Sequence, residues 1–369
     1  MKTALKWMAF AGLGMTGACA TPSGAGRETQ QAMVERTRTQ VPVPPWPAGD
    51  ERGMANTQGR GTWQRCAWHL SDPNAKVYDL SQVSSNTMPM SPFAPPLNFQ
   101  YRPSGGLPGA AHVVNGEGFG GQGADPSNQG TQFDGFGHFG YLPQPWDGKP
   151  PFPADSAKYY GGFEQKDVKP TPDSPLLKLG MDKVPPIVTE AVLLDARSYV
   201  GKGKALQAGQ VITVADIEGM LQAQGLGWRG LQPGDALYIY TGWEENWSDP
   251  DQGQGYYTKA PGIAYDVAKY LGDKAVTAMG IDAPFLDAVP EGLLQGKAGP
   301  AEGTPPGMVF SIHHQNLAQS GIHNVENAHL SEMVADKVWT SCTMILPLKL
   351  KGAATSQVRP VAIGAPSAQ

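Results

Sequence analysis

Residues 191–281 decide the fold class, reading AVLLD at 191–195, TVADIEGML at 213–221, DALYIY at 235–240 and VTAMGI at 276–281. The apolar runs have the length of buried strands. Thr213 and Asp216 form a T-x-x-D pattern, which is typical of a helix N-terminus. Strands that alternate with helices predict an α/β core in which some strands are parallel.

Two further elements follow this core. Residues 309–320 are predicted to form a helix that ends at Gly321, because glycine readily adopts the conformation that terminates helices. Residues 343–350 are predicted to form a final strand. Upstream, residues 78–172 are dense in Gly, Pro, Asn and Gln, which predicts short strands joined by long loops that carry functional residues.

Composition and charge exclude some classes of function. The chain has 369 residues, of which 40% are hydrophobic, so it can bury the core of a large domain. Its formal net charge is -5. This balance does not supply the basic surface on which phosphate-backbone binding depends, so nucleic acid is not expected as a partner.

The N-terminal residues are typical of an export signal. Residues 1–6 carry two lysines, and the apolar stretch 7–18 is too short to span a bilayer. Small residues then precede Cys19, which resembles a bacterial lipoprotein signal. We therefore expect a signal peptide over 1–18, lipidation at Cys19, a flexible tether over 19–45, and an exported protein anchored to the membrane only through its lipid and facing the periplasm or cell exterior. An ordinary cleaved signal with an incidental cysteine is the alternative.

Cys66 and Cys342 are the two cysteines that remain if Cys19 is lipidated. In an oxidising compartment they have one way to pair. Two separate buried thiols are equally compatible with the sequence, because it does not show whether they are close.

Two polar clusters carry the candidate chemistry. The first, at 127–138, reads SNQGTQFDGFGH and offers the Asp134 carboxylate and the His138 imidazole. The second, at 312–327, reads IHHQNLAQSGIHNVEN and offers histidines followed by Glu326. Each is a weak signal alone, because a glycine-rich loop with one acid and one histidine is common.

Together the clusters resemble the signature of the cyclase/kynurenine-formamidase-like hydrolases. That signature is similar to H-x-G-T-H-x-D-x-x-x-H, followed downstream by a histidine and, twelve residues later, by a glutamate in an E-N pair. Here Asp134 and His138 match the first element, and His314 with Glu326 matches the second at the same separation. Supporting motifs are YDLS at 78–81, GIDAP at 280–284 and LPLKLKG at 346–352.

The resemblance implies a swivelling β/β/α-type single catalytic domain with a mixed sheet over residues 46–362, followed by a disordered tail at 363–369. It also implies a homo-oligomer. The expected activity is metal-dependent hydrolysis of an amide, cyclic amide or lactone bond in a small molecule.

Asn128 and Gln132 stand where the family pattern has two histidines. An amide oxygen is a weaker partner for zinc than imidazole. We therefore expect one divalent ion, zinc or manganese, held by Asp134, His314 and Glu326. Asn128 and Gln132 are then weak ligands or substrate contacts.

His138 matches the family's acid/base, and its unperturbed pKa of about 6.5 suits that role. Two alternatives stay open. His138 is a further ligand in one of them. In the other, the protein is a catalytically degenerate relative that binds a metal or small molecule without turnover.

Overall fold

The computed structural model describes residues 28–367, apart from 105–107, 109–110, 112, 114 and 120–125. The predicted signal peptide and Cys19 lie outside the described residues. No helix in the described part of the chain is both long and apolar enough to cross a membrane.

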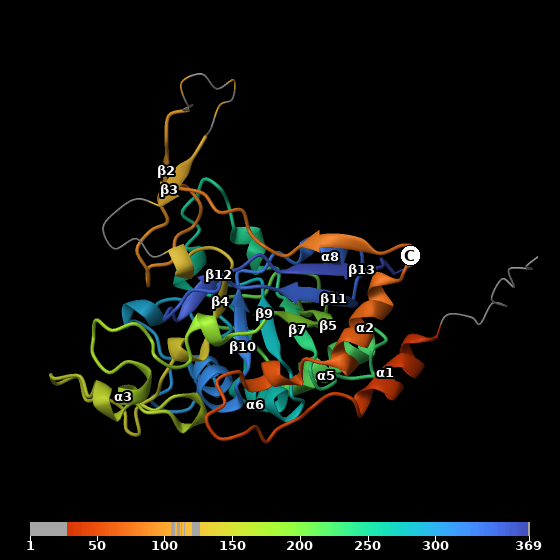
Figure 1. The fold of residues 1–369 in the computed structure, drawn as a ribbon, viewed down its shortest axis with the longest axis horizontal. Coiled ribbons are helices and arrows are strands. Elements are labelled where there is room, and N and C mark those ends of the chain that lie inside the picture. The colour runs from red at the N-terminus through yellow and green to blue at the C-terminus, as the bar shows by residue number, and fades with distance from the viewer. Residues whose placement is uncertain are drawn as a thin grey trace, which may run out of the picture.

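One nine-stranded mixed sheet forms the centre of the molecule (Figure 1). Its four middle strands run parallel to one another. Every other pair of neighbouring strands in the sheet is antiparallel. In spatial order the strands are β1 (Lys76–Asp79), β13 (Val361–Gly364), β11 (Thr340–Ile345), β5 (Ile187–Asp195), β7 (Ala236–Tyr240), β9 (Ala278–Ile281), β10 (His323–Glu326), β4 (Gln132–Asp134) and β12 (Thr355–Gln357).

Strand β5 shows how the two faces of the sheet are covered. Val192 and Leu194 pack against the helices α5 (Val214–Ala223) and α6 (Tyr265–Asp273). Leu193, on the opposite face, packs into a second core with β1, β13 and α8 (Ser331–Ala335). Both faces of the central strands are therefore buried, as their continuous apolar runs predict.

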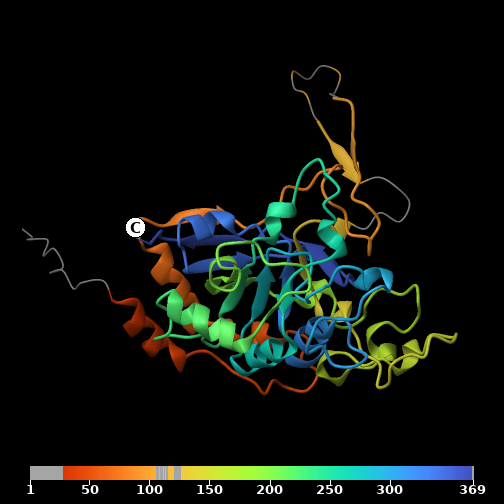
Figure 2. The ribbon, with the colours of Figure 1, turned by 180° about the vertical axis from the view of Figure 1, so that it is seen from behind.

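Shorter elements complete the chain. The hairpin β2 (Phe99–Tyr101) and β3 (Glu117–Phe119) projects away from the body (Figure 2). Other short elements are α3 (Gln165–Val168), α4 (Ala196–Tyr199), α7 (Ser311–His313) and the two-stranded pair β6 (Val211–Ile212) and β8 (Gly262–Ile263). The predicted single α/β domain with a mixed sheet is thus confirmed.

The expected tether is replaced from residue 30 by an ordered helix. Helix α1 (Gln30–Arg38) begins at Thr29, whose side chain accepts a hydrogen bond from Ala32 N–H. It buries Met33, Val34 and Thr37 and lies beside α2 (Arg60–Leu70) (Figure 1). The polar composition of this stretch concealed a narrow apolar face, which is sufficient for docking.

The disordered tail expected at 363–369 does not begin at residue 363. Ile363 and Gly364 belong to β13 and pair with β1. Ser367 then donates its backbone N–H to the carbonyl oxygen of Asp336. The domain therefore extends beyond residue 362 at its C-terminal end.

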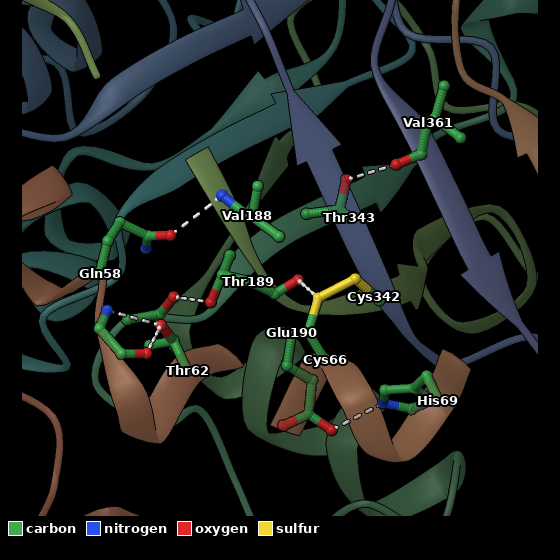
Figure 3. Close-up of a disulfide and its surroundings, with 12 residues drawn as sticks. Gln58, Thr62, Cys66, His69, Val188, Thr189, Glu190, Cys342, Thr343 and Val361 are labelled. Carbon is green, nitrogen blue, oxygen red and sulfur yellow. Dashed lines mark hydrogen bonds and ion pairs between the residues drawn. A yellow bond between two sulfur atoms is a disulfide. The ribbon is translucent and has the colours of Figure 1, made fainter. Parts of the chain in front are cut away.

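A disulfide joins Cys66 on α2 to Cys342 on β11 (Figure 3). It ties the N-terminal helices to the antiparallel part of the sheet across 276 residues of sequence. Of the two states that the sequence left open, the structure has the paired one.

A buried ionic cluster lies next to this disulfide. Glu190 Oε2 is 2.7 Å from Arg229 Nη2, and Glu190 Oε1 is 2.9 Å from His69 Nε2. Arg65 and Arg229 also contact the Asp235 carboxylate, at 2.9 and 3.0 Å. Two arginines and two carboxylates balance in charge, which is the condition under which such groups are tolerated in a core.

Replacing Glu190 with glutamine is expected to lower the free energy of unfolding by about 3 kcal/mol near neutral pH, since an arginine loses its buried partner. Burial alone raises the pKa of Glu190, but Arg229, His69 and Arg65 hold it well below its ordinary value. Its contribution is therefore present above the unfolded-state pKa of about 4.3 and is lost as the pH falls.

Denaturant unfolding across acid pH checks this expectation. Glu190→Gln should unfold with a shallower dependence on pH below about 4 than the wild type. Glu245→Gln, which breaks the exposed pair with Arg197, serves as the matched surface control and should cost less than about 1 kcal/mol. Equal losses in both variants would contradict the role given to the cluster.

Candidate active site

Strands β4 and β10 bring the two polar clusters of the sequence together. They pair antiparallel, with Glu326 opposite Gln132 and Asn324 opposite Asp134. Side chains of directly opposed residues lie on the same face of a sheet. The amide of Gln132 donates to Glu326 Oε2 at 3.0 Å and approaches Asp134 Oδ1 at 3.5 Å. The carboxylates of Asp134 and Glu326 are both buried.

His313 is the histidine that meets these carboxylates. Its Nε2 lies 3.3 Å from Glu326 Oε1 and 3.6 Å from Asp134 Oδ2. It comes from α7, which leads directly into the π-helix η10 (His314–Ser320). Sequence reasoning did not select this residue.

Asp287 fixes the orientation of the His313 ring. Its Oδ2 lies 2.6 Å from His313 Nδ1, and its Oδ1 accepts the Ile312 backbone N–H at 2.7 Å. Because Nδ1 is engaged by Asp287, Nε2 is the nitrogen presented to Asp134 and Glu326. A carboxylate behind a histidine is the usual partner of a metal-ligating imidazole.

His314, selected by the twelve-residue spacing, lies elsewhere. It is buried and meets the Tyr141 ring edge-on at 4.9 Å between centroids. The helix that follows is π-helical, and its i→i+5 hydrogen bonds accommodate one more residue than α-helical turns do. The histidine that faces the two carboxylates, His313, is thirteen positions before Glu326 instead of twelve.

His138 joins the same group from a 3-10 turn, η3 (Phe136–His138). One ring nitrogen of His138, one of His313 and one Asp134 oxygen all lie within 4.8 Å of one another. The tight turn depends on Gly135, because a Cβ there would stand 2.9 Å from both the Ala354 carbonyl oxygen and Met181 Sδ. His138 is more exposed than Asp134 and His313.

The group opens into a cavity of about 290 Å³. Asn128, Gln132, His138, His313 and Glu326 are among the polar residues that line it. The rest of its lining, called the aromatic wall below, is mostly aromatic and consists of Phe93, Phe139, Tyr257, Phe285 and Phe310 together with Pro284 and Ser91. Of the predicted site residues, the structure gathers Asp134, His138, Glu326, Asn128 and Gln132 and leaves His314 outside.

The site contains more acidic than basic side chains. Burial, and then the Asp134 charge, raises the pKa of Glu326 well above its ordinary value. Burial by itself lowers the pKa of His313, but Glu326, Asp287 and Asp134 raise it to about 10. Three buried carboxylates thus converge on one imidazole.

These residues fit a divalent cation. Asp134 Oδ2 is buried, and none of the described residues donates a hydrogen bond to it. Carboxylate oxygens and imidazole nitrogens are the ligands that zinc and manganese take from proteins. A cation would neutralise charge that one imidazolium leaves uncompensated.

His323, on the far side of Asp134, has a structural role. Its Nδ1 donates to the Asp134 carbonyl oxygen at 3.0 Å, and its ring stacks on Phe136 at 4.1 Å. Burial lowers the pKa of His323 to about 4, so it remains neutral. It supports the backbone that carries Asp134.

Comparisons with known proteins found one family model and several solved structures that match this chain. The family model described as Cyclase matches residues 78–288. A solved structure described as a novel cyclase is 23% identical, with a TM-score of 0.67, and the match covers 86% of this chain and 95% of that one. Comparison with curated proteins found no match.

Two isatin hydrolases also share the fold. One, bound to the product analogue thioisatinate, is 16% identical with a TM-score of 0.51, over 80% of this chain and 94% of its own. Isatin hydrolase A from Ralstonia solanacearum is 18% identical with a TM-score of 0.50, over 80% and 94%. At these identities the likeness shows the fold alone.

Proposed function

Since the chain belongs to the cyclase family, as its motifs predicted, we propose that it is a divalent-metal-dependent hydrolase of a small molecule. The bond cleaved is an amide, a cyclic amide or a lactone. The observation that carries the proposal is the convergence of Asp134, Glu326 and Asp287 on His313 in a buried cavity wall.

Asp134, His313 and Glu326 are the proposed ligands of one zinc or manganese ion, with His313 in place of His314. Such an ion, when bound, lowers the pKa of water and polarises a carbonyl group. Gln132 donates to both carboxylates and so holds their oxygens in place. Asn128 lines the same cavity, where it is the proposed substrate contact.

His138 is the proposed acid/base. It stands at the more exposed side of the group, where it reaches both the cavity and the ligand atoms. In this role it accepts a proton from the attacking water and returns it to the leaving nitrogen or oxygen. If it is instead a ligand, its removal will cost the metal as well as the activity.

The aromatic wall indicates the shape of the substrate. Phe93, Phe285 and Phe310 meet edge to face, with centroids 5.8 to 6.2 Å apart. Flat apolar groups pack well against such a surface, and the cavity volume limits the ligand to a compact molecule. We propose a substrate whose reactive carbonyl is attached to a planar apolar part.

A panel of small amides, cyclic amides and lactones, isatin among them, tests the proposal. The wild type, His138→Ala and Glu326→Ala are assayed before and after chelation, and metal content is measured in each. We expect wild-type turnover that chelation abolishes, a metal-free Glu326→Ala, and a metal-loaded but inactive His138→Ala.

Hydrolysis that survives chelation and both substitutions would refute the proposed hydrolase. Stoichiometric metal without turnover on any compound would favour a binding protein that has lost catalysis. The amides at 128 and 132 are the observation that keeps this second function in view.

Asp287→Asn is expected to weaken metal binding by about 10–100-fold, because the ring of His313 loses the charge that orients it. The amide oxygen still accepts from Ile312 N–H, so the helix start should survive. Metal titration of the two proteins, with Tm measured alongside, checks this. Unchanged affinity would show that Asp287 does not support the site.

The proposed compartment is outside the cytoplasm, with membrane attachment only through a lipid on Cys19. The Cys66–Cys342 disulfide supports this location, since such bonds persist in oxidising environments. Radiolabelled lipid incorporation into the wild type, but not into Cys19→Ala, would be the result that fits.

A further inference from the structure

Tyr257 places a buried hydroxyl, whose proton no described residue accepts, in the wall of the cavity. Its side chain is 4% exposed, and it lines the same cavity as Gln132, His138 and Glu326. The Gly130 backbone amide acts on its hydroxyl oxygen, but none of the described residues accepts the hydroxyl proton. Buried donors are nearly always paired, so an unused one at a site points to a ligand that accepts it.

The hydroxyl is held in place and remains protonated. Tyr257 lies in the 3-10 turn η8 (Tyr256–Thr258), and its ring packs edge to face against Tyr256 and Trp247 at 5.1 and 6.5 Å. Burial raises the pKa of Tyr257, the Gly130 backbone amide opposes this, and the Glu326 charge adds to the rise. A neutral phenol at working pH is a hydrogen-bond donor.

We infer that Tyr257 donates a hydrogen bond to the carbonyl oxygen of the substrate and stabilises the charge that develops there. This inference rests on the proposed function and adds a catalytic residue to it. The phenol keeps its proton throughout, so no proton transfer is added to the role of His138. A preorganised donor in a dry site is effective because it needs no reorganisation during the reaction.

The adjacent Tyr256 offers a matched control. Its hydroxyl donates to the carbonyl oxygen of Asp282 at 3.2 Å, and it does not line the cavity. Tyr256→Phe therefore removes one buried hydroxyl of the same kind a single residue away. Both variants keep the ring and its packing.

Kinetics of the metal-loaded enzyme on the substrate found with the panel test the inference. We expect Tyr257→Phe to lower kcat by about 100-fold with little change in KM, while Tyr256→Phe keeps kcat within a few-fold of the wild type. Metal content should equal the wild-type value in both. Equal kcat in Tyr257→Phe and the wild type would overturn the inference.

Binding of benzoate to the metal-loaded proteins, followed calorimetrically, separates this inference from the proposed hydrolase. Benzoate carries carboxylate oxygens beside a planar ring, and these oxygens accept hydrogen bonds as the carbonyl oxygen of the proposed substrate does. Tyr257→Phe should bind it about tenfold more weakly than the wild type and Tyr256→Phe do, even if no panel compound is turned over. Equal affinity in Tyr257→Phe and the wild type, or no binding by the wild type, would overturn the inference.

Discussion

His313→Ala is expected to abolish metal binding and with it hydrolysis. Nε2 of His313 is the imidazole nitrogen that faces Asp134 and Glu326, and its loss leaves the two buried carboxylates without their imidazole partner. Affinity for the ion should fall by more than the roughly 100-fold that loss of an outer partner can cost. Activity should fall by about a thousandfold or more, which corresponds to several kcal/mol of transition-state stabilisation.

His314→Ala is the matched control, since the two histidines are neighbours in sequence. His314 contacts Tyr141 and lies outside the cavity, so its replacement should leave metal affinity and kcat within a few-fold of the wild type. Calorimetric metal titration and kinetics of both variants check the pair. Loss of metal in His314→Ala with retention in His313→Ala would restore the assignment that the twelve-residue spacing gives.

Removal of the Cys66–Cys342 disulfide is expected to have the largest effect on stability. Closing a loop of 276 residues restricts the unfolded chain, and the chain-entropy model gives about 5–6 kcal/mol for a loop of this size. The double variant Cys66→Ala/Cys342→Ala should therefore melt roughly 5–10 °C below the oxidised wild type. The site lies on β10 and β4, four and five strands away from β11 in the sheet, so metal affinity should not change.

Reduction supplies the control for this prediction. Dithiothreitol should lower the Tm of the wild type to near that of the double variant and leave the double variant itself unchanged. This comparison also separates the disulfide from any effect of Cys19. A wild-type Tm that does not respond to full reduction would contradict the stabilising role.

The sequence allowed the α/β core to be predicted because buried parallel strands read as uninterrupted apolar runs. The elements at 191–195, 235–240 and 276–281 all lie in the sheet, as β5, β7 and β9. Helix α1 was missed for the opposite reason. Only three of its residues are buried, so the polar composition of the stretch hid it.

The candidate site was predictable wherever its residues have fixed spacing within one strand or turn. Asp134 and His138 belong to such a segment, and Glu326 lies on the strand beside it. The choice between His313 and His314 depends on the helix type that follows, and π-helical turns leave little signal in a sequence. Asp287 and Tyr257 reach the site only through tertiary packing, so no local pattern marks them.

Titration of the chelated wild type with zinc or manganese, with hydrolysis followed at each addition, tests the central proposal most directly. We predict that activity is absent without the ion, rises in proportion to the metal added and levels off at one equivalent per chain. A break at two equivalents would contradict the single ion. Full activity in the metal-free protein would contradict the metal-dependent hydrolase itself.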